Sequence, residues 1–160
     1  MISIRSINFI LIMVIIIGFL LALYGTSLSC DYNMTIKTEK TIYNGVCQFG
    51  KASWIEQYDD PVNGSTWYVE SFSFSYGNHL IYIIINREQV HKSGKNLNPL
   101  DIFNIQAENI QILRYEYYDM FNNKLALFST FPEEHIYIAK MSGQLSLFSS
   151  KKNTLIPIMH

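Results

Sequence analysis

Two cysteines, Cys30 and Cys47, are the side chains with the clearest capacity for covalent chemistry. In an oxidising compartment they could form a disulfide that closes a loop of about 18 residues, which the loop-entropy model values at about 3 kcal/mol. Neither cysteine has a second cysteine or a histidine at the spacing of zinc ligands. The sequence therefore predicts no metal site around them.

The histidines do not form a catalytic or metal-binding pattern. His79, His91, His135 and His160 are far apart in the chain, and no two of them have i, i+4 spacing. His79 and His135 each begin a predicted strand, where a surface position is the ordinary outcome. A Gly-rich phosphate loop and a nucleophile elbow are also missing from the sequence.

The carboxylates that lie closest together lack the spacing of an acid–base pair or of a calcium loop. Glu56, Asp59 and Asp60 do not show the alternating oxygen ligands of such a loop, so we expect a solvated turn there. Glu116 and Asp119 are three apart in a predicted strand, which places them on opposite faces. We therefore expect a protein that is not an enzyme and that needs no cofactor.

An aromatic cluster around one predicted hairpin is the best candidate for binding a partner. Because only one face of each strand can point into a single core, some of these rings should be exposed and could act as binding hot spots. The alternative is that tyrosines simply fit pleated surfaces well. Two carboxylates in the cluster would suit a basic partner. The candidate partner-binding residues are Tyr115, Glu116, Tyr117, Tyr118, Asp119 and Phe121.

Alternating residues predict that the chain after the N-terminal segment is mainly β. From Trp67 to Tyr76, serines alternate with aromatic residues, which is the period of a strand. Gly77-Asn78 can form a two-residue hairpin turn. The run from His79 to Asn86 is almost continuously apolar and predicts a strand buried on both faces. These segments together predict a hairpin over about residues 66–86.

Further hairpins are expected at about 109–130, with a turn at Asn122-Asn123, and at about 135–149, with a turn at Met141–Gly143. Weaker strands are expected near 34–43 and 48–57. One short helix should cover 99–107, with Asn98 as its N-cap and Pro99 at its first position. The expected fold is mainly β, an antiparallel sheet, sandwich or barrel of about seven or eight strands with one short helix, preceded by an N-terminal hydrophobic helix.

The N-terminal segment predicts export. Arg5 precedes an apolar run, and the segment from Ile7 to Cys30 contains no charged residue. Three outcomes remain open: a membrane anchor through residues 7–28, cleavage after Ser27-Leu28-Ser29, and lipidation. For the last, Ser27-Leu28-Ser29-Cys30 resembles the processing box of bacterial lipoproteins, although Ser27 stands where that pattern prefers leucine. The resemblance implies lipid on Cys30 and a free Cys47, which excludes the disulfide in the same molecule.

The charge balance and the export signal together limit the function. The formal net charge is −1, so binding to nucleic acid through a basic stripe is not expected. The expected organisation is an anchor or signal over residues 1–30 and one extracytoplasmic domain over residues 31–160, at the inner membrane or envelope and facing the periplasm. The resulting hypothesis is a non-catalytic, membrane-associated binding protein of the bacterial envelope with a protein partner, in one version an immunity-type inhibitor of a toxin. The alternatives are a structural subunit of a secretion, pilus or conjugation machine, and a small-ligand-binding barrel.

Overall fold

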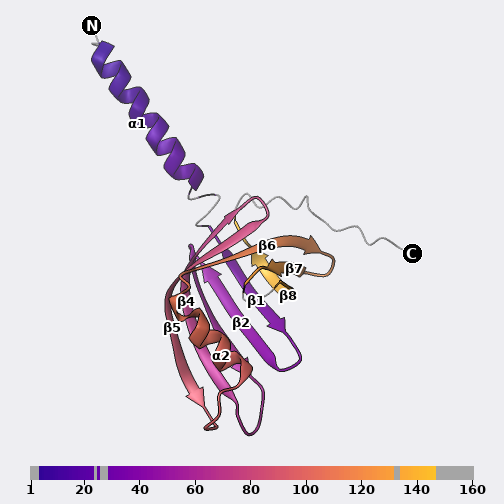
Figure 1. Cartoon of the computed structure of the whole chain (residues 1–160). Helices are drawn as coiled ribbons and strands as arrows, with labels where there is room; N and C mark the ends of the chain where they lie inside the picture. Colours follow the sequence, from indigo (N-terminus) through magenta and orange to yellow (C-terminus); the bar gives the residue numbers. More distant parts are fainter. Residues whose placement is uncertain (1–3, 24, 26–28, 132–133, 147–160) are drawn as a thin grey trace.

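A computed structural model shows a closed eight-stranded antiparallel β-barrel that follows an N-terminal helix (Figure 1). It describes residues 4–23, 25, 29–131 and 134–146. The helices are α1 (Ile4–Leu23), α2 (Pro99–Gln106) and the 3-10 turn η2 (Ala107–Asn109). The strands are β1 (Asp31–Lys37), β2 (Thr41–Gln48), β3 (Lys51–Tyr58), β4 (Ser65–Tyr76), β5 (His79–Lys92), β6 (Ile112–Met120), β7 (Lys124–Ser129) and β8 (His135–Gln144).

The barrel is a meander in which each strand pairs with the next, and β8 closes it against β1. The closing ladder runs from the pair Asp31–Gln144 to the pair Ile36–Ala139. Closure pairs each strand on both sides over part of its length, which removes most of the unpaired N–H and C=O groups that an open sheet would present. The expected mainly β fold with one short helix is therefore confirmed, and the barrel is the form it takes.

Small residues on β4 make room for large rings inside the barrel. Ser71, Ser73 and Ser75 face inward in the second half of β4 and are almost fully buried, whereas Phe72 and Tyr76 point outward and are exposed. Opposite them, on other strands, stand tyrosines and leucines of the core. Eight-stranded barrels have an interior just wide enough for side chains, and alternating small and large residues fill it.

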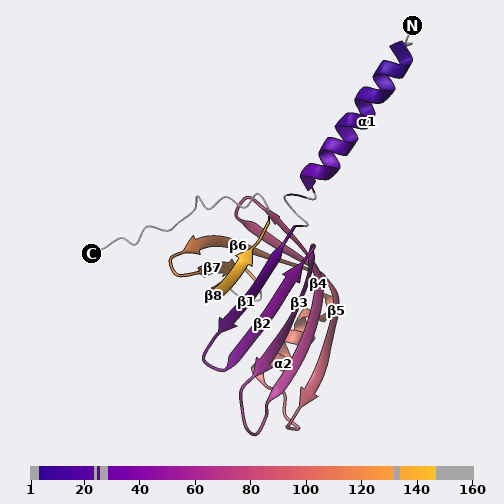
Figure 2. The same ribbon diagram turned by 180° about the vertical axis from the view of Figure 1, so that it is seen from behind.

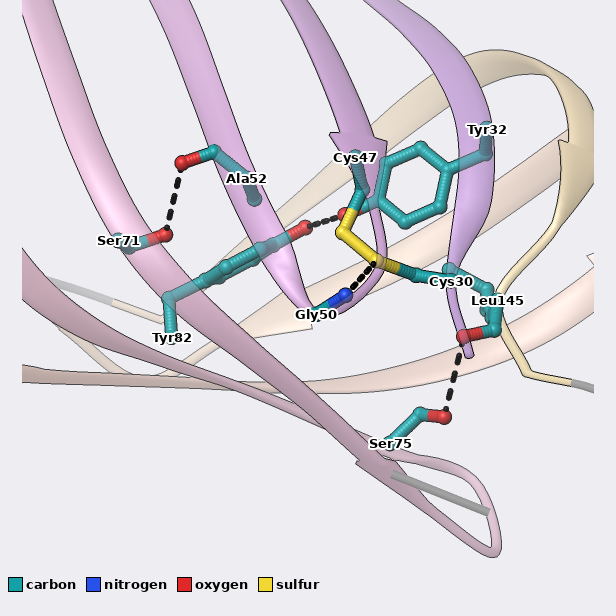
Figure 3. The surroundings of a disulfide bond; sticks show 9 residues. All are labelled: Cys30, Tyr32, Cys47, Gly50, Ala52, Ser71, Ser75, Tyr82 and Leu145. Atoms are coloured by element: carbon teal, nitrogen blue, oxygen red, sulfur yellow. Dashed lines mark hydrogen bonds between the residues drawn. A yellow bond between two sulfur atoms is a disulfide. The ribbon is translucent and has the colours of Figure 1, made fainter. Parts of the chain in front are cut away.

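The half of the barrel nearest α1 is packed around a disulfide and a buried tyrosine pair. Cys30 and Cys47 are bonded and lie with their Cα atoms 5.7 Å apart (Figure 3). The hydroxyl groups of Tyr32 and Tyr82 are 2.6 Å apart and share a hydrogen bond. Burial raises the pKa of both phenols, so the pair is neutral over the physiological range. The amide N–H of Gly50 also points at Sγ of Cys30, at 3.2 Å.

At the end of the barrel away from α1, strands β2 to β5 extend beyond β6. Strand β6 pairs with β5 only from His79 to Ile83, while β4 pairs along almost all of β5. Helix α2 packs against β3 and β4 in this region, in front of the strands in Figure 1 and behind them in Figure 2. Helix α2 thus covers the inner side of the extension.

Three local predictions are wrong. The single strand expected near 34–43 is instead the end of β1, a turn at 38–40 and the start of β2. The expected hairpin at 135–149 does not form, because β8 continues straight through Met141–Gly143 and pairs with β1. Gly143 has φ of +98°, and a side chain there would meet the backbone of β1. The run His79–Asn86 is not buried on both faces, since Ile83 and Ile85 are exposed on the outside of the barrel. Pairing with β1 and closure of the barrel, both long-range, override these local signals.

Helix α1 stands apart from the barrel in both views (Figures 1 and 2). Its large side chains are exposed on every side of the helix from Ile7 to Leu21. Among the described residues, no helix is both long enough and apolar enough to cross a membrane. Residues 24 and 26–28 of the predicted anchor segment lie outside the described residues.

Candidate ligand-binding site

A cavity of about 70 Å³ lies inside the barrel in the half that α2 covers. Its wall is mainly aromatic and aliphatic, with one carboxylate. The rings of Trp54 and Tyr82 are 5.2 Å apart, and those of Tyr82 and Tyr115 are 6.0 Å apart. The cavity is lined by Met34, Ile36, Tyr43, Trp54, Glu56, Tyr82, Phe103, Leu113, Tyr115, Leu127, Phe131 and Tyr137.

Glu56 is the carboxylate in this wall and is only 3% exposed. The sequence led us to expect a solvated turn here, and that expectation is wrong for Glu56. It shares the inward face of β3 with Ala52 and Trp54, which the alternation along the strand dictates. Trp54 Nε1 donates to Oε1 at 2.8 Å, and Asn104 Nδ2 donates to Oε2 at 2.7 Å.

Burial raises the pKa of Glu56, because the charged form loses its hydration. The hydrogen bonds from Asn104 and Trp54 and the positive charge of Arg87 act in the opposite direction but do not cancel the shift. Glu56 therefore holds its proton to a higher pH than an exposed glutamate does.

Arg87 and Asn104 extend the polar contacts of Glu56 toward α2. The guanidinium Nη1 of Arg87 donates to the side-chain oxygen of Asn104, whose amide nitrogen reaches Glu56. The guanidinium also stacks over the ring of Phe103, 5.7 Å from its centroid. The Nε and Nη2 atoms of Arg87 are buried without an acceptor in the described protein. A chain of polar groups therefore joins the cavity wall to the helix.

Helix α2 is fastened to the barrel by polar side chains. Asn98 caps the helix and accepts a 2.9 Å bond from the amide N–H of Asp101. Asp101 is fully buried and accepts from Trp67 Nε1 at 2.9 Å and from Gln89 Nε2 at 2.8 Å. Burial raises its pKa, but the hydrogen bonds from Trp67, Ser65 and the amide N–H of Asn98, together with nearby Lys92, outweigh that effect, so the pKa of Asp101 lies below its ordinary value.

The face of α2 that meets the barrel is thus unusual. Its buried residues are Leu100, Asp101 and Asn104, two of which are polar, while Ile102 and Ile105 remain about half exposed. Helix α2 is therefore held to the barrel mainly by hydrogen bonds and by one buried leucine.

The predicted partner-binding cluster is divided between the two faces of β6. Tyr115 lines the cavity, and Tyr117 is buried and donates to the carbonyl of Gly77 at 2.8 Å. Glu116 lies on the outer face, where it accepts a 2.6 Å bond from Tyr118 Oη. Asp119 falls on the inward side of the alternation, opposite in face to Glu116, as its spacing predicts.

Phe121 is 60% exposed in the turn between β6 and β7. The six predicted residues therefore do not form one exposed surface. The reason is the period of the strand, which sends neighbouring side chains to opposite sides of the barrel wall.

The sequence patterns did not identify three polar residues of the site, which are Glu56, Arg87 and Asn104. Glu56 and Arg87 gave no local signal, because a charged residue in an alternating strand is ordinarily read as solvent-facing. Asn104 belongs to the predicted helix, and its position one turn after Leu100 was the available hint that it faces inward. Bulges in the pairing of β4 with β5 bring Arg87 opposite Val69, on the inside.

Both cysteines and the described histidines lie outside the lining of the cavity. Cys30 is bonded to Cys47, so a molecule with this disulfide has no thiol at Cys30 for lipid. His79 and His135 are exposed and begin β5 and β8. Within the described ranges, no group of three or more His, Cys, Asp or Glu side chains is arranged to hold a metal ion.

Comparison of the sequence with protein-family models and with curated proteins finds no match.

Proposed function

We propose that this protein is a non-catalytic binding protein whose barrel takes one small, largely apolar ligand at the end covered by α2. The observation that carries the proposal is the aromatic cavity with Glu56 in its wall, under a helix held by polar contacts. Ligand sites are typically concave and apolar with a few placed polar groups. The cavity combines these features.

The size of the cavity sets a condition on binding. Its volume of about 70 Å³ is less than half of the roughly 150 Å³ that accommodates benzene in an engineered cavity. A ligand of that size therefore requires α2 to shift. When α2 moves away, Asn104 leaves both Glu56 and Arg87, whose donors and acceptors then become available to a polar group of the ligand.

The test is native mass spectrometry of the full chain after incubation with a lipid extract. We expect an added mass that the Leu127→Trp variant loses, because Leu127 lines the cavity and tryptophan would fill it. Ile138→Trp is the matched control, since Ile138 is half exposed on the outside of the neighbouring strand. A chain that retains nothing, or an adduct equally present in both variants, would overturn the proposal.

We also propose that residues 7–28 attach the barrel to a membrane on its extracytoplasmic side. The exposed apolar side chains on all sides of α1 support attachment, and the Cys30–Cys47 disulfide supports an oxidising compartment. Carbonate extraction together with protease protection of the barrel tests both parts. A chain released by carbonate, or one digested only from the cytoplasmic side, would count against them.

The immunity-type inhibitor and the machine subunit stay predictions. Each requires a protein partner, which crosslinking followed by capture from native membranes would identify. One stoichiometric soluble partner would favour the inhibitor, and a set of membrane subunits would favour the machine.

A further inference from the structure

Each hairpin turn at one end of the barrel presents an exposed aromatic ring. Phe49 lies between β2 and β3 and is 79% exposed. Tyr76 is the last residue of β4, directly before the turn to β5, and is 78% exposed. Phe121, between β6 and β7, is 60% exposed. We call these three residues the aromatic rim.

The aromatic rim lies at the end of the barrel where the chain arrives from α1. The amide N–H of Phe49 donates to the carbonyl of Cys30 at 3.0 Å. Cys30 is seven positions after Leu23, the last residue of α1, and seven residues span at most about 25 Å. The other two turns share this end, since Tyr117 N–H bonds to Asn78 O and Met141 N–H bonds to Asn123 O.

The opposite end of the barrel has a different composition. The turn at 38–40 is Thr-Glu-Lys, and the turn after β3 begins with Asp59 and Asp60. Its exposed apolar side chains are all aliphatic: Val62 and Leu97, Val90 near the end of β5, and Ile102 and Ile105 on α2. Among the described residues of that end, no turn carries an exposed aromatic ring. The barrel is thus polarised along its axis, with α2 and the cavity at the end away from the aromatic rim.

Phe49 occupies a backbone conformation that its side chain disfavours. Its φ is +49°, followed by Gly50 at +78°, a pair of left-handed residues for which Asn-Gly is the preferred choice. The turn between β6 and β7 uses Asn122 and Asn123 for the same purpose. Since the ring of Phe49 is exposed, burial in the barrel does not offset the strain. A strained, exposed aromatic residue indicates a role outside folding.

We propose that the aromatic rim rests in the headgroup layer of a lipid bilayer and holds the barrel upright, with its α2 end toward water. The inference rests on the proposed membrane attachment through residues 7–28. Aromatic side chains are favoured at the level of lipid headgroups, where one part of the ring is apolar and the other is wet. Three rings on separate turns can contact a flat surface together, and the polar end would then face away from it.

The test is site-specific photo-crosslinking of the full chain in vesicles of phosphatidylethanolamine and phosphatidylglycerol. Benzoylphenylalanine replaces Phe49, Tyr76 or Phe121 in turn, and Val62 or Leu97 in the matched controls. We call the state in which the aromatic rim lies in the headgroup layer the seated state. Burial of one aromatic side chain favours this state by about tenfold or more. We expect lipid adducts at the three rim positions, each about tenfold above the two controls.

A second arm tests whether the rim acts as a unit. With the crosslinker at position 121, Phe49→Asn combined with Tyr76→Ser should lower the lipid adduct to the level of the controls. The pair Val62→Ser and Leu97→Ser should leave it unchanged. Flotation of the vesicles, measured in every sample, reports attachment separately from seating.

A chain that floats with the vesicles but shows no excess of lipid adduct at the rim would overturn the seating and leave the attachment standing. Adducts with a second copy of the chain at the rim would overturn it in favour of a protein interface. A chain that does not float would overturn both the attachment and the seating.

Discussion

Replacement of Glu56 by glutamine should reverse the order of stability between the native protein and the variant as pH rises. Burial raises the pKa of Glu56 in the folded barrel above the ordinary value of 4.5, which applies to the unfolded chain. Between these two pKa values the folded state holds one more proton than the unfolded state. The free energy of unfolding therefore falls as pH rises, by up to about 1.4 kcal/mol per pH unit.

Glutamine removes this dependence but also loses a contact. Its single side-chain oxygen can accept from Trp54 Nε1 or from Asn104 Nδ2, whereas the carboxyl group accepts from both. One lost hydrogen bond costs about 1 kcal/mol at any pH. Below the unfolded pKa the native protein should thus be more stable by about 1 kcal/mol. Above the unfolded pKa, the difference in free energy of unfolding between the native protein and Glu56→Gln should shrink and then change sign.

The assay is urea unfolding of the full chain in a detergent, for both proteins, from about pH 4 to about pH 8. Glu116→Gln is the control with the opposite sign. The hydrogen bond from Tyr118 lowers the pKa of Glu116, so its contribution is lost as pH falls. A difference between native protein and Glu56→Gln that stays constant with pH, or that grows in favour of the native protein, would refute the reasoning.

Three further substitutions test the helix cover, the strained turn and the crosslink. Asn98→Ala removes the cap of α2, so it should lower the free energy of unfolding by about 1 kcal/mol and speed amide hydrogen exchange in α2. The exposed control Asn96→Ala should do neither, and equal exchange rates in the two variants would contradict the role of Asn98 as the cap. Phe49→Asn relieves the left-handed strain and should raise the free energy of unfolding by about 1 kcal/mol, so a lower urea midpoint would be evidence against strain. Replacing Cys30 and Cys47 together by alanine should lower the free energy of unfolding by about 3 kcal/mol. An unchanged urea midpoint would show that the disulfide does not stabilise the folded protein.

The sequence by itself predicted the mainly β fold, the hairpin of β4 and β5 and the start of the short helix. The period of two along Trp67–Tyr76 and the turn residues Gly77-Asn78 predict the hairpin of β4 and β5. Asn98 and Pro99 predict the start of α2. These signals are local, because a turn or a cap depends on a few neighbouring residues. The same local signals misread Met141–Gly143 as a turn, since only the pairing of β8 with β1 keeps that segment extended.

The tertiary structure alone decided which face of each strand is inside and what meets there. Alternation shows that Glu56 and Tyr115 differ in face from their neighbours, but it does not say which face the closed barrel encloses. Asn104 reaches Glu56 from 48 positions along the chain. Such a contact depends on the closure of the sheet and the docking of α2, which involve residues distant in sequence. The candidate cavity exists only after those long-range pairings have formed.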